Sequence, residues 1–217
     1  MRLKKASCRG VIDDRALLTL CNDRCIITGM ARPREYDPNA VLHAAMRTFW
    51  KRGYEGTSIR DLSRASGLST RSMYDAFGDK ERFYEAVLDH YLCKVAQPML
   101  DVLKTERGFK ALRRYAEVVA SRVTIDGCLL VNATSERNLL GPSARRRVES
   151  YFEQLRRLVR CRLEEARDDG QFQGDPLVRS AQFVSTVVGV IMAARFGFEK
   201  ELSGAVLGQL LQDVQRS

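Results

Sequence analysis

The sequence predicts an all-α protein built from two helical domains. Almost no run alternates apolar and polar residues in the way a half-buried strand does, and there are only five prolines. Instead, apolar side chains return at three- and four-residue spacing through successive stretches, several of which begin at a capping residue or end at glycine. The chain has 217 residues, 45% of them hydrophobic, so it can bury the core of one domain or of two small ones.

Residues 1–30 differ in pattern from the rest of the chain. Their apolar runs, ALLTLC and CIIT, are interrupted by Asn22, Asp23 and Arg24, whereas a secretory signal needs about 7–15 continuous apolar residues. No stretch of the chain reaches the roughly 20 apolar residues of a membrane span. We therefore predict a cytoplasmic protein without a membrane partner. Because Met30 begins a second plausible start, MARPREYDPNAV, we interpret residues 1–30 as a mis-assigned extension or a disordered arm.

The first predicted helix runs from Asp37 to about Arg52. Asp37 is a capping residue, and Gly53 supplies the stop. Its apolar residues form one stripe: Val41, Leu42, Ala45, Met46 and Phe49.

The next stretch, TSIRDLSRASGLSTRSMYDAF at residues 57–77, predicts two short helices joined at a glycine. Thr57 is expected to cap the first helix and Ser69 the second. Gly67 provides the sharp turn, because a positive φ costs glycine little. In the second helix the apolar residues face back toward the first: Leu68, Met73 and Phe77.

The opposite side of this second helix is polar. It carries Thr70, Arg71, Ser72, Tyr74 and Asp75. A short capped helix with an outward face of this kind is typical of the recognition helix of a helix-turn-helix unit. The stretch after it, GDKERFYEAVLDHY, predicts another helix, capped by Asp79 with Lys80 in its first turn.

Residues 37–88 as a whole resemble the DNA-binding domain of the tetracycline-repressor (TetR/AcrR) family. Nine residues carry the resemblance: Phe49, Gly53, Thr57, Ile59, Leu62, Gly67, Tyr74, Phe77 and Lys80. Ser63 departs from a usual alanine, and Arg71 from a usual small residue. The resemblance implies a three-helix DNA-binding domain at residues 31–80 and a helical effector-binding and dimerisation domain at residues 81–217.

The resemblance also implies the roles of individual residues on double-stranded operator DNA. Thr57 and Lys80 stand at helix N-termini, which attract phosphate, and Tyr74 offers a hydroxyl beside the groove. Arg71 is the candidate for a bidentate contact with guanine. The predicted DNA-binding residues are Thr57, Ser69, Thr70, Arg71, Ser72, Tyr74 and Lys80. A net charge of +9 suits such a polyanionic partner.

Six further helices are predicted after the DNA-binding region. Pro98 is expected to kink the first of them or end it early. Their expected ranges are about 79–103, from about 105, 128–137, 142–170, 176–196 and 199–215.

One of these, the helix at 176–196, has small residues at every fourth position, which lets two helices approach closely. They are Ala181, Ser185, Gly189, Ala193 and Gly197. This row could pack within one subunit or against a second copy. The family resemblance favours a homodimer, with the last two helices forming a four-helix bundle across the twofold axis.

Cys128 follows Gly127 near the start of a short helix, a position that can lower a thiol pKa and make it nucleophilic. The stretch GCLLVN is similar to one in members of the family that include sensors of reactive electrophiles. The alternative is an inert core cysteine. The resemblance in any case implies a small-molecule effector that releases DNA.

The chain lacks the patterns of an enzyme or of a metal protein. It has no glycine-rich phosphate loop, no nucleophile elbow, no C-x-x-C pair and only two histidines, and its six cysteines are expected to be reduced thiols. We predict no catalytic residues, no metal and no cofactor. The alternative function is a helical small-molecule-binding or interaction module without specific DNA binding, against which the intact Thr57, Tyr74 and Lys80 argue.

Overall fold

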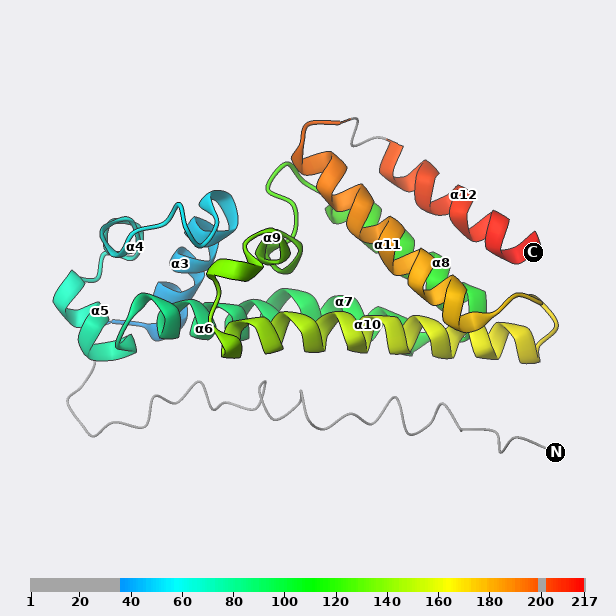
Figure 1. Cartoon of the computed structure of the whole chain (residues 1–217), viewed down its shortest axis with the longest axis horizontal. Coiled ribbons are helices and arrows are strands. Elements are labelled where there is room, and N and C mark those ends of the chain that lie inside the picture. Colours follow the sequence, from blue (N-terminus) through cyan, green and yellow to red (C-terminus); the bar gives the residue numbers. More distant parts are fainter. Residues whose placement is uncertain (1–35, 199–201, 217) are drawn as a thin grey trace. The chain divides into compact units, whose positions relative to one another are not determined.

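The computed structural model describes residues 36–198 and 202–216, and in these ranges the regular structure is entirely helical (Figure 1). Residues 1–30, interpreted from sequence as an extension, lie outside the described residues. Contacts divide the described chain into two units. The helix-turn-helix unit comprises residues 36–96 and 126–151, and the C-terminal unit comprises the remainder. The predicted fold class, an all-α chain with an N-terminal helix-turn-helix, is confirmed.

The helix-turn-helix unit contains seven of the described helical segments and the start of α10. They are α3 (Pro38–Arg52), α4 (Ile59–Ser66), α5 (Thr70–Phe77), α6 (Lys80–Tyr91), the π-helix η1 (Leu92–Ala96), α9 (Leu129–Ser135), the 3-10 helix η2 (Arg137–Leu139) and the beginning of α10 (Pro142–Asp168). Helix α3 packs against both α4 and α6. Its buried residues are those predicted from the apolar stripe, and the Phe49 ring meets Tyr84 of α6 edge-on at 4.8 Å between centroids.

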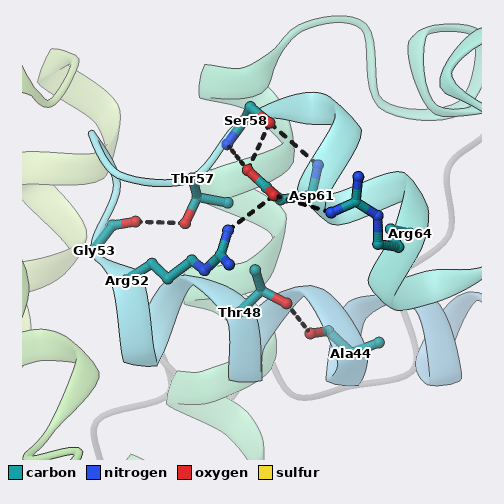
Figure 2. A network of polar contacts seen from close by, with 8 residues as sticks. All are labelled: Ala44, Thr48, Arg52, Gly53, Thr57, Ser58, Asp61 and Arg64. Carbon is teal, nitrogen blue, oxygen red and sulfur yellow. Dashed lines mark hydrogen bonds and ion pairs between the residues drawn. The ribbon is translucent and has the colours of Figure 1, made fainter.

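The first helix of the helix-turn-helix begins differently from the prediction. Ser58, not Thr57, is the N-cap of α4: Ser58 Oγ accepts from the Asp61 N–H at 3.2 Å, and Asp61 Oδ2 accepts from the Ser58 N–H at 2.9 Å. Thr57 is wholly buried, and its hydroxyl donates to the Gly53 carbonyl at 2.7 Å (Figure 2). The predicted cap was wrong because this bond turns the Thr57 hydroxyl inward, while Ser58 and Asp61 have the spacing of a capping box.

The helix predicted at 79–103 is interrupted by a wider turn. Helix α6 ends at Tyr91, η1 follows, and α7 (Gln97–Thr105) begins one residue before Pro98. Pro98 therefore lies in the first turn of a new α-helix, where a missing N–H is tolerated. The helical path continues from α6 through η1 into α7 without an intervening loop.

The C-terminal unit contains the helices predicted for the second half of the chain, with boundaries that differ by a few residues. They are α7, α8 (Gly108–Arg122), the rest of α10, α11 (Pro176–Arg195) and α12 (Leu202–Arg216). Helix α12 packs against α8 and α11. The buried Arg162 of α10 donates to the Glu106 carbonyl at 3.0 Å and to Glu165 at 2.8 Å. Glu165 in turn accepts from the Gly108 N–H at 3.0 Å, so the connection into α8 is fixed to α10.

Candidate nucleic-acid interface

Helix α5 presents the polar face predicted for a recognition helix. Gly67 takes a left-handed conformation with φ of 74°, and Ser69 caps α5 by accepting from the Ser72 N–H at 3.1 Å. The inward side chains, Leu68, Met73 and Phe77, are buried. The outward ones are exposed: Ser69, Thr70, Arg71, Tyr74 and Asp75. A rigid, capped helix therefore holds an arginine and a tyrosine in solvent, with Tyr74 53% exposed.

Two of the predicted DNA-contacting hydroxyls are less available than the sequence suggested. Thr57 is buried, so its side chain does not face solvent. Ser72 is half-buried, and its hydroxyl lies 2.8 Å from that of Ser69. Ser58, which is exposed at the start of α4, was missed from sequence, although the S-x-x-D spacing to Asp61 could have identified it.

Asp61 connects α4 to α3. Its carboxylate bonds to Ser58 and lies 2.8 Å from Arg52 Nη1 of α3 (Figure 2). The hydrogen bonds from the Ser58 side chain and backbone, with a contribution from Arg52, lower the pKa of Asp61 to about 2. The carboxylate is thus ionised across the neutral range, and its pairing with Arg52 ties the helix-turn-helix to α3.

Lys80, the first residue of α6, rests against an aromatic ring. Its Nζ lies 4.3 Å from the centroid of Tyr54. Burial lowers the pKa of Lys80, and the nearby Glu136 and Glu55 oppose this shift. A Lys80 contact with phosphate would require the ammonium to leave Tyr54 or to be shared with it.

The turn before α4 is held by a carboxylate from much later in the chain. Glu136, at the end of α9, accepts from the Tyr54 N–H at 2.8 Å and from the Glu55 N–H at 2.9 Å. Gly53 lies so close that a Cβ there would be 2.7 Å from Glu136 Oε1. Sequence reasoning missed Glu136, because no local signal links positions 82 residues apart.

Two further bonds join the α9 segment to the end of α3. Trp50 Nε1 donates to the Gly127 carbonyl at 3.1 Å. Asn132 Nδ2 donates to the Trp50 carbonyl at 3.3 Å and to the Asp126 carbonyl at 3.0 Å. We call Trp50, Asn132 and Glu136 the α9 clamp, since together they hold the C-terminal end of α3 and the turn that leads to α4.

Comparison with known proteins identifies the family. Residues 41–87 match the family model of bacterial regulatory proteins of the tetR family, and residues 106–206 match that of the tetracyclin repressor-like C-terminal domain. The chain belongs to the tetR family. The resemblance predicted from sequence is therefore confirmed.

Relatives of this TetR-family protein include named regulators. The HTH-type transcriptional repressor ComR of Escherichia coli (strain K12) is 34% identical over 115 residues, which cover 50% of this chain and 55% of ComR, so the match spans about half of that protein. The uncharacterized HTH-type transcriptional regulator YezE of Bacillus subtilis (strain 168) is 26% identical over 199 residues, covering 86% of this chain and 93% of YezE. A cysteine mutant of the TetR family transcriptional regulator CifR, solved with a 26-bp operator duplex, is 28% identical with a TM-score of 0.73. That similarity covers 84% of this chain and 98% of CifR.

Cys128, the candidate sensor of the TetR-family protein, lies in a less reactive setting than predicted. Its Sγ accepts from the Tyr91 hydroxyl at 3.2 Å. Burial raises the pKa of Cys128, while bonds from Tyr91 and from the backbone N–H groups at the start of α9 lower it in part. The predicted net lowering of the Cys128 pKa was wrong, because desolvation of the thiolate exceeds the effect of these hydrogen bonds. A sensing role for Cys128 stays a prediction.

The row of small residues predicted to form the dimer interface lies on the surface of the single chain. Ala181, Ser185 and Gly189 are exposed on α11, and Ala193 is half-buried. A Cβ added at Gly189 would meet nothing within 4 Å. Helix α11 also has the length and apolar composition of a membrane span, although little of it is buried in the single chain. Whether the row forms a dimer interface stays a prediction.

No group of three potential metal-ligating side chains occurs among the residues that the structure describes. Cys93 and Cys128 are free thiols there, whereas Cys161 is disulfide-bonded, so the expectation of six reduced thiols was wrong for Cys161. Cys8, Cys21 and Cys25 lie outside the described residues.

Proposed function

We propose that this TetR-family regulator is a cytoplasmic repressor that binds a near-palindromic operator as a homodimer and is released by a small-molecule effector. The observation that supports this most directly is the exposed polar face of α5, where Arg71 and Tyr74 project from a capped helix. Such a helix fits the major groove of B-DNA. The protein acts through binding and carries out no catalysis.

In this proposal the residues divide between base and backbone contacts. Thr70 and Arg71, in the first turn of α5, read base edges, and the Arg71 guanidinium forms a bidentate pair with guanine O6 and N7. Tyr74, Lys80 and the exposed Ser58 contact phosphates and fix the register. Ser58 takes the place that sequence assigned to Thr57, because Thr57 is buried.

The homodimer would form through the last two helices. The small residues of α11 are exposed, and α12 adds the exposed Leu202 and Val206. A second copy covering this surface would account for an apolar helix that is little buried in one chain. Two copies of α5 then read two half-sites spaced by the helical repeat of DNA.

An effector releases the operator only if it binds the released geometry more tightly than the DNA-bound one. Covalent modification at Cys128 is a second route to release, and a chain of contacts from Cys128 to the α9 clamp supports it. The Cys128 thiol accepts a hydrogen bond from the Tyr91 hydroxyl, and the Tyr91 ring packs edge-on against Trp50 of the α9 clamp at 5.0 Å between centroids. An added group at Cys128 would need space among these rings and would strain the clamp.

The test is selection of bound sequences from a random duplex pool, with wild type, Arg71→Ala and Arg146→Ala. Arg146 is an exposed arginine of α10 in the same unit, so its removal matches the charge change. We expect a near-palindrome for wild type and Arg146→Ala, and relaxed preference at defined base pairs for Arg71→Ala, at a cost of about 1–3 kcal/mol. Binding that depends only on salt and shows no enriched sequence would refute specific recognition and favour the alternative, a small-molecule-binding or interaction module.

A further inference from the structure

A groove runs along α3 in the helix-turn-helix unit. Its walls come from α3, from Asp61, Arg64 and Ala65 of α4, and from His90 and Lys94 at the end of α6 and in η1. Its volume is about 1010 Å³. Small-molecule sites usually have volumes of about 300–1,000 Å³, so the groove is large enough for one.

The lining of the groove is strongly cationic. It contains one carboxylate, Asp61, and five lysine or arginine side chains: Arg47, Lys51, Arg52, Arg64 and Lys94. Asp61 is already bonded to Ser58 and paired with Arg52 at 2.8 Å. Within the described part of the chain, Arg47, Lys51 and Lys94 form no ion pair. Figure 2 shows Arg52 of α3 and Arg64 of α4 converging on the single carboxylate.

Small side chains leave space between these cations. Ala40 and Ala44 on α3 and Ala65 on α4 line the groove. The rings of His43 and His90 lie 6.2 Å apart at one part of the wall. Burial lowers the pKa of His90, and the charges of His43 and Lys94 lower it further. Because five cations share one carboxylate, the groove keeps a net positive charge that attracts an anion from solution.

Two other occupants fit the observations less well. Residues 1–35, which lie outside the described structure, contain eight Lys or Arg and four Asp or Glu, so this segment has the same sign of charge as the groove. In the proposed function, operator DNA is contacted by α5, Ser58 and Lys80, and none of these residues lines the groove. A separate, small and multiply charged ligand fits the charge and the size best.

We propose that this groove binds a small oligophosphate, either a free polyphosphate chain or the triphosphate of a nucleotide. The planar guanidinium groups of Arg47 and Arg64 suit bidentate pairing with phosphate oxygens, and Lys51 and Lys94 supply point charges. The alanine-lined part has room for an attached apolar or planar group. The inference does not rest on operator binding, because the groove and α5 are lined by different residues.

The experiment is isothermal titration calorimetry of the full chain without DNA, using sodium tripolyphosphate and, separately, ATP without divalent metal. The groove variant is Arg47→Ser/Lys94→Ser. The control, Arg113→Ser/Arg146→Ser, removes the same charge from exposed positions that line no part of the groove. We expect one tripolyphosphate per chain for wild type and the control, and about tenfold weaker binding for the groove variant. Tighter binding of ATP than of tripolyphosphate would identify a nucleotide as the ligand, and the reverse a free chain.

Three results would overturn the proposal. The first is no binding by wild type at low salt, and the second is an equal loss in the groove and control variants. The third is unchanged tripolyphosphate binding by the groove variant together with weaker operator binding and a smaller salt slope, which would make the groove a DNA contact. Thermal unfolding of each variant checks that it is folded. Lys94→Ser alone, at an exposed position, replaces the double variant if that one unfolds.

Discussion

Removing the Glu136 carboxylate should destabilise the helix-turn-helix unit. Glu136 forms two charge-assisted bonds, at 2.8 and 2.9 Å, to the backbone N–H groups of Tyr54 and Glu55. A hydrogen bond to a charged group contributes about 1.5–3 kcal/mol net, and solvent access to the half-buried Glu136 reduces this. For Glu136→Ala we therefore expect a loss of about 1–3 kcal/mol. Glu136→Gln keeps one acceptor oxygen and should lose less.

The assay is urea unfolding followed by tryptophan fluorescence at one fixed protein concentration. Trp50 is the only tryptophan, and it belongs to the α9 clamp, so its signal reports on this unit. With an m-value of about 1–3 kcal/mol/M, the midpoint should fall by roughly 1 M. The matched control is Glu149→Ala, which removes a carboxylate from an exposed ion pair with Arg137 and should change stability by less than about 1 kcal/mol.

The two variants decide the question together. If Glu136→Ala and Glu149→Ala unfold at the same urea concentration as wild type, Glu136 does not hold the turn, and the reasoning is refuted. Operator affinity provides a second readout: Glu136→Ala should weaken binding even though Glu136 is not among the residues proposed to contact DNA. Unchanged affinity would mean that the turn keeps its geometry without the carboxylate.

Four further outcomes are expected. Gly53→Ala should cost about 1–3 kcal/mol in the same urea assay, because φ is 76° and the added Cβ would lie 2.7 Å from the carboxylate of the clamp. The pKa of His90 is lowered in the folded protein, so on acidification the unfolded chain binds a proton at His90 at a higher pH than the folded chain does. The free energy of unfolding should therefore fall as the pH drops through about 6.5. His90→Gln should lose less stability than wild type between pH 7.5 and 5.5. Iodoacetamide should modify Cys128 several-fold more slowly than Cys93 in the native protein, by peptide mass spectrometry, because burial raises the Cys128 pKa. Gly189→Leu should leave the fold intact but shift the protein toward monomer in sedimentation, whereas an unshifted dimer would place the interface elsewhere.

The sequence predicted those parts of the fold that depend on local signals. Asp37, Ser69 and Asp79 each cap a helix as expected, and Gly67 takes the left-handed turn, because these choices are made within four residues of chain. The N-cap of α4 was predicted wrongly, because the adjacent residues Thr57 and Ser58 both carry a hydroxyl group. Only Ser58 has Asp61 three residues later as its capping-box partner. The π turn before Pro98 also escaped prediction, since proline signals an interruption but not the form it takes.

Features set by tertiary contacts could not be predicted in the same way. Cys128 illustrates the reason: its place at a helix terminus lowers the thiol pKa, as the sequence suggested, but burial beside Tyr91 outweighs that effect. The cationic groove likewise requires α4 and the end of α6 to lie beside α3. Its cations are spread over 48 residues of sequence and form no charge run.

The turn between α3 and α4 shows how distant contacts can govern the recognition helix. The Thr57 hydroxyl donates to the Gly53 carbonyl at 2.7 Å. The Glu136 carboxylate accepts from the N–H groups of Tyr54 and Glu55, the two residues that follow Gly53. These bonds fix the turn, and the turn sets the direction in which α4 begins. Because α4 packs against α5, the turn also affects the orientation of α5. A substitution at Thr57 or Glu136 should therefore alter operator affinity by reorienting α5, without removing a proposed DNA contact. We therefore predict that Thr57 affects DNA binding although its hydroxyl is buried.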